Sequence, residues 1–126
     1  MKPHLALSST LLRDIVARAL AEDLGSGDIT TQLLFPKAVK AEAVIQTKQE
    51  GIIVGLPVAK VVFKQVDPKL RFRPIVQDGD RVKPGMIVAH LYGDGRSILQ
   101  GERVALNFIQ RLSGIATLTA RFVETV

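Results

Sequence analysis

The sequence predicts an α+β domain in which an antiparallel sheet packs against helices. Stretches with an apolar residue at every second position alternate along the chain with stretches that have apolar residues at three- and four-residue spacing. Turn-forming pairs of glycine with aspartate or proline separate the predicted strands. No repeat, linker or low-complexity tract interrupts the series, so one domain accounts for the pattern.

The first predicted element is an amphipathic helix near the amino terminus. Ser8, Ser9 and Thr10 are candidate caps, and Leu24-Gly25 is the predicted end. Its apolar positions are Leu12, Ile15, Val16, Ala19 and Leu20. Residues 25–31, with the sequence Gly-Ser-Gly-Asp-Ile-Thr-Thr, contain the glycines of a tight turn and predict a structured loop.

Two short strands and a helix are predicted next. Ala41, Ala43 and Ile45 alternate with polar residues, as in a half-buried strand, and residues 52–54 form a second apolar strand that Gly55 closes. Pro57 suits the first turn of a helix, which must end before Pro68 because proline restricts the residue before it. This helix places Val58, Val61, Val62 and Val66 on one face.

A twisted hairpin is predicted between residues 70–76 and residues 86–92. The first stretch alternates apolar and basic residues and leads to Asp78-Gly79-Asp80, a strong turn sequence. A second turn, Lys83-Pro84-Gly85, has proline and glycine in the successive positions that a type II turn prefers.

The last segment predicts a long helix that runs nearly to residue 126. Either Asp94 or Ser97 can cap it, and Ser97 with Gln100 has the spacing of a capping box. Ser113-Gly114 predicts a break, a bend or a close packing contact, because glycine destabilises a helix by about 1 kcal/mol relative to alanine. One face is apolar, with Ile98, Ala105, Ile109, Leu112 and Ala116, and the pattern resumes with Ile115, Leu118, Phe122 and Val126. A separate polar stripe comprises Arg96, Gln100, Arg103, Asn107 and Arg111.

Composition limits the ligands and the compartment. The formal net charge of +5 would concentrate anions near the surface. The basic residues are dispersed and aromatic residues make up only 5% of the chain, so small anions such as phosphates or carboxylates fit better than nucleic acid. A solvated basic surface without a ligand is the alternative. The chain has no cysteine and no long apolar run, so we expect a cytoplasmic location and no membrane contact.

Three ordered segments resemble the quinolinate phosphoribosyltransferase family. They are Glu22-Asp23-Leu24-Gly25-Ser26-Gly27-Asp28-Ile29-Thr30-Thr31, Gly101-Glu102-Arg103-Val104-Ala105-Leu106-Asn107 and Leu112-Ser113-Gly114-Ile115-Ala116-Thr117. The resemblance implies an amino-terminal domain of the α/β-hammerhead type, related to barrel-sandwich hybrids, over residues 1–112. Residues 113–126 would then begin the connection to an α/β barrel that this chain does not contain, in keeping with a periodic segment that ends without a stop pattern.

The same resemblance implies an enzyme, a pentosyltransferase of NAD biosynthesis. Such an enzyme converts quinolinate and phosphoribosyl pyrophosphate to nicotinate mononucleotide, pyrophosphate and carbon dioxide, with Mg²⁺ bound mainly by the barrel. It also implies a homodimer or a higher homo-oligomer, in which the arginine of the Glu-Arg motif binds quinolinate in the partner subunit's site. Because the barrel supplies the other groups, we expect no catalytic residue in this chain and an inactive fragment.

The resemblance assigns the quinolinate-binding role to Arg103. A planar guanidinium can donate paired hydrogen bonds to a carboxylate, whereas without the motif a solvated or ion-paired arginine would be the simpler interpretation. Its helix angle places Glu102 towards the apolar face, so we expect a partner for its carboxylate, either a neighbouring cation that it orients or a structural ion pair. Asn107 and Arg111 lie on the same stripe as Arg103 and could extend an anion-binding or subunit-contact surface. His4 and His90 lack ligand spacing, so no metal site is expected.

Other functions remain open from the sequence. Residues 78–85 also resemble the hairpin of biotinyl and lipoyl carrier domains, although Lys83 precedes Pro84 instead of occupying the tip with a carrier motif. A related phosphoribosyltransferase-like protein, of the nicotinate or molybdate-locus type, would share this domain and bind another acid. A free-standing dimerisation domain is a third alternative.

Overall fold

The computed structural model describes residues 8–34 and 40–125, with the side chains of all of these except 22–34, 122, 124 and 125. The described part contains three helices and five strands. In chain order the elements are α1 (Ser9–Leu34), β1 (Lys40–Gln46), β2 (Gly51–Ile52), α2 (Leu56–Val66), β3 (Arg71–Pro74), β4 (Arg81–Val82), β5 (Ile87–Asp94) and α3 (Gly95–Thr125).

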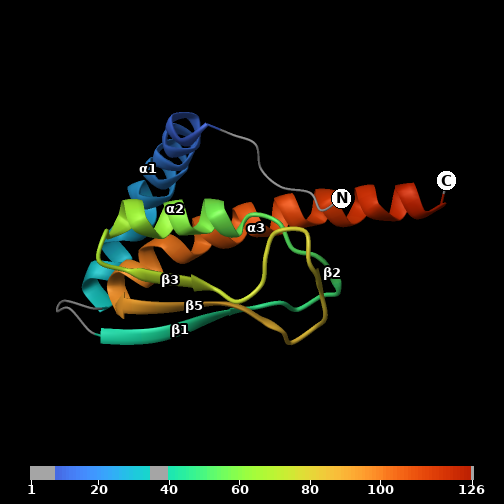
Figure 1. Ribbon diagram of the computed structural model, residues 1–126. Helices are drawn as coiled ribbons and strands as arrows, with labels where there is room; N and C mark the ends of the chain where they lie inside the picture. Colours follow the sequence, from blue (N-terminus) through green and yellow to red (C-terminus); the bar gives the residue numbers. More distant parts are fainter. Residues whose placement is uncertain (1–7, 35–39, 126) are drawn as a thin grey trace.

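Helices pack on one face of the antiparallel sheet β1-β5-β3 (Figure 1). Helices α2 and α3 run along this face, and α1 packs against both of them while it runs across them. A second antiparallel pair, β2-β4, lies beside α3, and the carboxyl-terminal part of α3 extends beyond it. The predicted α+β class with an antiparallel sheet and packing helices is therefore confirmed.

The sheet buries one face, as the two-residue alternation predicts. In β1, Ile45 is buried while Glu42 and Val44 are exposed, and in β3 Phe72 is buried between exposed arginines. Phe72 lies opposite Leu91 of β5 and stacks on Phe63 of α2 with ring centroids 5.9 Å apart. The core therefore lies between the sheet and the two helices that cover it, and Val16 and Leu20 of α1 extend it on these helices. Each large apolar side chain removed from water there contributes roughly 1.5–3 kcal/mol.

The predicted hairpin is confirmed, with β3 paired antiparallel to β5 in the register Phe72 to Leu91. The connection between them carries β4, which pairs with β2. Both predicted turns are present, because Gly79 and Gly85 have φ values of 95° and 87°. The N–H of Met86 donates to the carbonyl of Lys83 over 3.2 Å, so residues 83–86 form the expected type II turn.

Helix α2 begins and ends close to the predicted positions. Pro57 lies in its first turn, and the helix ends at Val66, two residues before Pro68. Gly55 precedes it with a φ of 113°, a left-handed conformation that strains other residues. The carboxylate of Asp78, from the first predicted turn, accepts hydrogen bonds from the N–H groups of Gly55 and Leu56, both over 3.0 Å. A carboxylate there satisfies two otherwise unpaired donors and complements the helix dipole.

Two predictions about α1 are wrong. The helix does not end at Leu24-Gly25 but continues to Leu34, and residues 25–31 are helical instead of forming a loop. Glycine weakens a helix but keeps the N–H that continues its hydrogen bonds, unlike proline. The helix ends two residues before Pro36.

Helix α3 corrects two further predictions. It is continuous over Gly95–Thr125, so the predicted break at Ser113-Gly114 is wrong. The predicted domain boundary between residues 112 and 113 lies inside this helix and stays a prediction. Asp94 is the cap, because its Oδ1 accepts a hydrogen bond from the N–H of Arg96 over 2.9 Å. Ser97 lies within the first turn, and its hydroxyl donates to Asp67, so the predicted capping box is wrong.

The glycine of the continuous helix at position 114 has free space around it. Apart from its chain neighbours and the adjacent helix backbone, no described heavy atom lies within 4 Å of a Cβ placed there. We therefore expect Gly114→Ala to raise the free energy of unfolding of this chain by about 0.5–1 kcal/mol, because alanine loses less backbone entropy than glycine in a helix. Urea unfolding followed by circular dichroism measures the change, and a less stable variant would contradict it.

Candidate functional site

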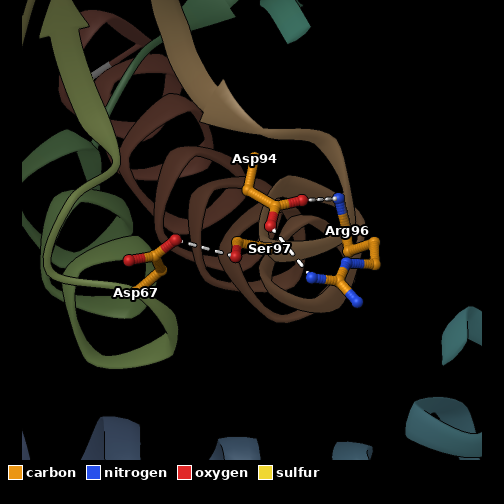
Figure 2. Close-up of polar contacts among 4 residues, drawn as sticks. All are labelled: Asp67, Asp94, Arg96 and Ser97. Atoms are coloured by element: carbon orange, nitrogen blue, oxygen red, sulfur yellow. Dashed lines mark hydrogen bonds and ion pairs between the residues drawn. The ribbon is translucent and has the colours of Figure 1, made fainter. Parts of the chain in front are cut away.

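The amino-terminal turn of α3 is fixed by a group of four polar residues (Figure 2). The Ser97 hydroxyl, buried with 9% exposure, donates to Asp67 Oδ2 over 2.9 Å and ties α3 to the end of α2. Arg96 Nη2 forms an ion pair with Asp94 Oδ2 at 3.3 Å on the other side of the turn. These contacts hold the start of α3 against the neighbouring elements.

Two further side chains fix the carboxyl-terminal half of α3. The Ser113 Oγ accepts a hydrogen bond from the N–H of Val54 over 2.8 Å, and the hydroxyl donates to the carbonyl of Val54 at 3.1 Å. Thr117 Oγ1 accepts a hydrogen bond from the N–H of Ile52 over 2.9 Å. The close contact predicted at Ser113-Gly114 is therefore present at Ser113, whereas Gly114 has open space beside it. Together the contacts of Ser113 and Thr117 fix the rotation of α3 about its own axis.

Arg103 lies at the centre of the face of α3 that points away from the core. At 100° per residue it stands about 200° around the helix from Ala105 and about 180° from Leu112. Ala105 is fully buried and Leu112 packs against the core, whereas Arg103 is exposed. Arg103 thus lies on the side of α3 opposite the residues that this helix buries.

Asn107 and Arg111 share this outward face. Both are exposed and lie one and two turns after Arg103. The predicted polar stripe is therefore present at these three positions, while Arg96, at its start, is engaged by Asp94. A row of two cations and an amide on a rigid helix can bind an anion held by another molecule or domain.

Glu102 is exposed, so its expected position towards the apolar face is wrong. The expected partner for its carboxylate stays a prediction. Solvation removes the penalty that would require a partner for a buried carboxylate.

The described residues contain no cluster of side chains suited to a metal ion. Among the described residues, no group of three or more His, Cys, Asp or Glu side chains is arranged to hold a metal ion. His90 lies on β5, where its ring stacks on Tyr92 with centroids 6.2 Å apart. His4 lies outside the described residues. Within the same described ranges, no helix has the length and hydropathy needed to cross a bilayer.

The residues that orient α3 were missed by sequence reasoning. Ser97 is 30 residues from Asp67, and Ser113 is 59 residues from Val54. One local pattern could have indicated the second contact: Ser113 and Thr117 are four residues apart, so both hydroxyls lie on one side of the helix.

A family model described as "Quinolinate phosphoribosyl transferase, N-terminal domain" matches residues 28–113. The nicotinate-nucleotide pyrophosphorylase [carboxylating], chloroplastic, of Oryza sativa subsp. japonica is 43% identical over 114 residues, which cover 90% of this chain and 31% of that protein. The probable nicotinate-nucleotide pyrophosphorylase [carboxylating] of Synechocystis is 41% identical over 107 residues, or 85% of this chain and 36% of the relative.

Solved structures give the same result. NadC from Streptococcus pyogenes has a TM-score of 0.87 and 39% identity, with 94% of this chain and 43% of that chain covered. The nicotinate-nucleotide pyrophosphorylase from Francisella tularensis has a TM-score of 0.87 and 36% identity, with coverage of 94% and 41%. The chain thus spans about a third of the length of the curated relatives and about two-fifths of these solved chains.

Proposed function

The chain belongs to the family of the quinolinate phosphoribosyltransferase amino-terminal domain, and we propose that it is the substrate-binding and dimerisation part of such an enzyme. The enzyme would convert quinolinate and phosphoribosyl pyrophosphate to nicotinate mononucleotide, pyrophosphate and carbon dioxide. The family match and the names of the relatives, carboxylating nicotinate-nucleotide pyrophosphorylases, support this reaction. The main observation in support of this role is the position of Arg103. This residue belongs to the Glu-Arg motif that resembles the family, and it lies on the face of α3 opposite the core.

Arg103 would bind a carboxylate of quinolinate in the site of a partner subunit. Its guanidinium can donate two parallel hydrogen bonds to one carboxylate and so fix the plane of the ring as well as its position. The outward direction of this face supports a ligand held outside the chain, and Asn107 and Arg111 would extend the contact surface. This role requires a dimer or a higher homo-oligomer.

The reaction explains why a bound cation is useful at the quinolinate carboxylates. Loss of pyrophosphate builds positive charge at the sugar carbon, and loss of carbon dioxide leaves negative charge on the ring. Arg103 would keep the substrate oriented for both steps and neutralise one carboxylate. Mg²⁺ would assist the departure of pyrophosphate, and the barrel domain would supply most of its ligands. Among the described residues, no group of three or more His, Cys, Asp or Glu side chains is arranged to hold it.

The alternatives differ in how well they fit. The family match favours the phosphoribosyltransferase over a biotinyl or lipoyl carrier. In the carrier-like hairpin, Asp78 caps α2 and Lys83 begins a type II turn, so both residues have structural roles. A related enzyme that acts on nicotinate, or a molybdate-locus protein, would share the fold and differ in the part of the relatives that this chain does not span. We place the enzyme in the cytoplasm, although the rice relative is named chloroplastic.

A chimeric enzyme tests this function. In the chimera, this chain replaces the part of Streptococcus pyogenes NadC that it matches, which is 43% of that chain. We expect the chimera to release carbon dioxide and pyrophosphate from quinolinate and phosphoribosyl pyrophosphate. The 126-residue chain alone should be inactive, as should the remainder of NadC alone. A folded, dimeric chimera without turnover would overturn the proposal, as would turnover by the isolated chain.

A further inference from the structure

Gly101 lies two residues before Arg103 and on the opposite side of α3, where it is buried against α2. A Cβ at this position would stand 2.9 Å from Phe63 Cδ1, 3.1 Å from Phe63 Cε1 and 3.5 Å from Val66 Cγ2. Contacts below 3.0 Å require the neighbouring group to move. The missing side chain therefore allows α3 to lie closer to α2 than any other residue would permit.

The neighbour that would have to move is held firmly. Phe63 is fully buried, and its ring stacks on Phe72 of the sheet at 5.9 Å. Interiors are close-packed, so a buried ring between a helix and a sheet has little free volume to enter. The strain of an added methyl group would instead move the turn of α3 that carries it.

The contacts on either side of Gly101 confine that movement to a short segment. Ser97 is bonded to Asp67 one turn before, and Ser113 is bonded to Val54 three turns after. These bonds oppose a shift of the whole helix as a rigid body. The displacement would therefore be largest around residue 101, within one turn of Arg103.

We propose that Gly101 is a positioning residue for Arg103, because the close approach of α3 to Phe63 sets where the guanidinium stands. The inference rests on the proposed role of Arg103 in quinolinate binding. Binding groups must be held within about 0.5 Å of their productive position, and relieving the contact with Phe63 requires a shift of that order. Gly101 would thus determine quinolinate affinity without touching the substrate.

The test is Gly101→Ala in the chimeric enzyme, assayed well below its unfolding temperature with both substrates varied. We expect the KM for quinolinate to rise about 5- to 20-fold while the KM for phosphoribosyl pyrophosphate stays unchanged, because a displacement of 0.5–1 Å costs up to about a hundredfold. A purely packing role would lower the folded fraction and hence the apparent kcat, and it would leave both KM values unchanged.

Matched variants make the test specific. Gly114→Ala adds the same methyl group to the same helix where nothing lies within 4 Å, so both KM values should stay at those of the unmodified chimera. Combining Gly101→Ala with Phe63→Leu removes the ring atoms that the methyl group meets, and should return the KM for quinolinate towards normal. Should Gly101→Ala not fold, the milder Val66→Ile enlarges the same contact, and we expect it to raise this KM about two- to fivefold.

The outcomes separate this inference from the proposed function. A KM for quinolinate that Gly101→Ala and Val66→Ile both leave within about twofold, while Arg103→Ala raises it, overturns the positioning role alone. An equal rise in both KM values also overturns it. An inactive unmodified chimera, or one that is indifferent to Arg103→Ala, overturns the proposed function instead.

Discussion

Replacing Arg103 with alanine in the chimeric enzyme should raise the KM for quinolinate between about 30-fold and 150-fold, because hydrogen bonds to charged groups contribute about 2–3 kcal/mol. The kcat should change less, since a contact made equally in the ground state and the transition state lowers KM alone. Steady-state kinetics with quinolinate varied at saturating phosphoribosyl pyrophosphate measure both constants. The expectation depends on the exposed position of Arg103, on the side of α3 opposite its buried residues.

Two further variants show whether the loss belongs to this guanidinium. Arg103→Lys keeps the charge but not the planar pair of donors, so its KM should fall between those of the unmodified and alanine chimeras. Arg18→Ala removes one exposed positive charge from α1 and should leave the KM for quinolinate within about twofold. An effect of Arg18→Ala as large as that of Arg103→Ala would mean that net charge, and not the site, attracts the substrate.

Asp78→Ala should lower the free energy of unfolding of the chain by about 2 kcal/mol, because it removes a charged cap and leaves two helix-terminal donors unpaired. The two donors are the N–H groups of Gly55 and Leu56, both part-buried and 3.0 Å from the carboxylate. Urea unfolding followed by circular dichroism measures the loss.

The controls for Asp78 vary the acceptor and the charge separately. Asp78→Asn keeps one accepting oxygen and should lose about half as much stability as Asp78→Ala. Asp14→Ala removes an exposed acid from α1 and should change the free energy of unfolding by less than about 0.5 kcal/mol. A loss for Asp78→Ala no larger than that for Asp14→Ala would contradict the capping role.

Local patterns were sufficient for much of this fold. The alternation around Ala43 predicted β1, and the Pro57 and Pro68 positions bounded α2, because each depends only on neighbouring residues. The outward face with Arg103 followed from helical periodicity, and the resemblance of the Glu-Arg motif distinguished Arg103 from other exposed arginines. Its role remains a prediction until the kinetics are measured.

The predictions that failed used local sequence patterns alone, which do not show helix continuity through glycine or contacts between residues far apart in the chain. Glycine lowers helix propensity by about 1 kcal/mol, yet α1 continues through Gly25 and α3 through Gly114, because glycine keeps the N–H that a continuous helix needs. The hydroxyl of Ser97 looked like half of a capping box, but its partner is Asp67, 30 residues earlier in the chain. The importance of Gly101 depends on Phe63 lying beneath it, which no local pattern shows.

The most direct test of the central claim is the affinity of the chimera for quinolinate, measured by isothermal titration calorimetry, since KM combines binding with turnover. The proposed role of Arg103 predicts that Arg103→Ala raises the Kd for quinolinate between about 30-fold and 150-fold. It predicts that the dimer and its unfolding temperature are unchanged. Equal Kd values for the unmodified and Arg103→Ala chimeras would contradict the claim that this domain contributes Arg103 to the quinolinate site.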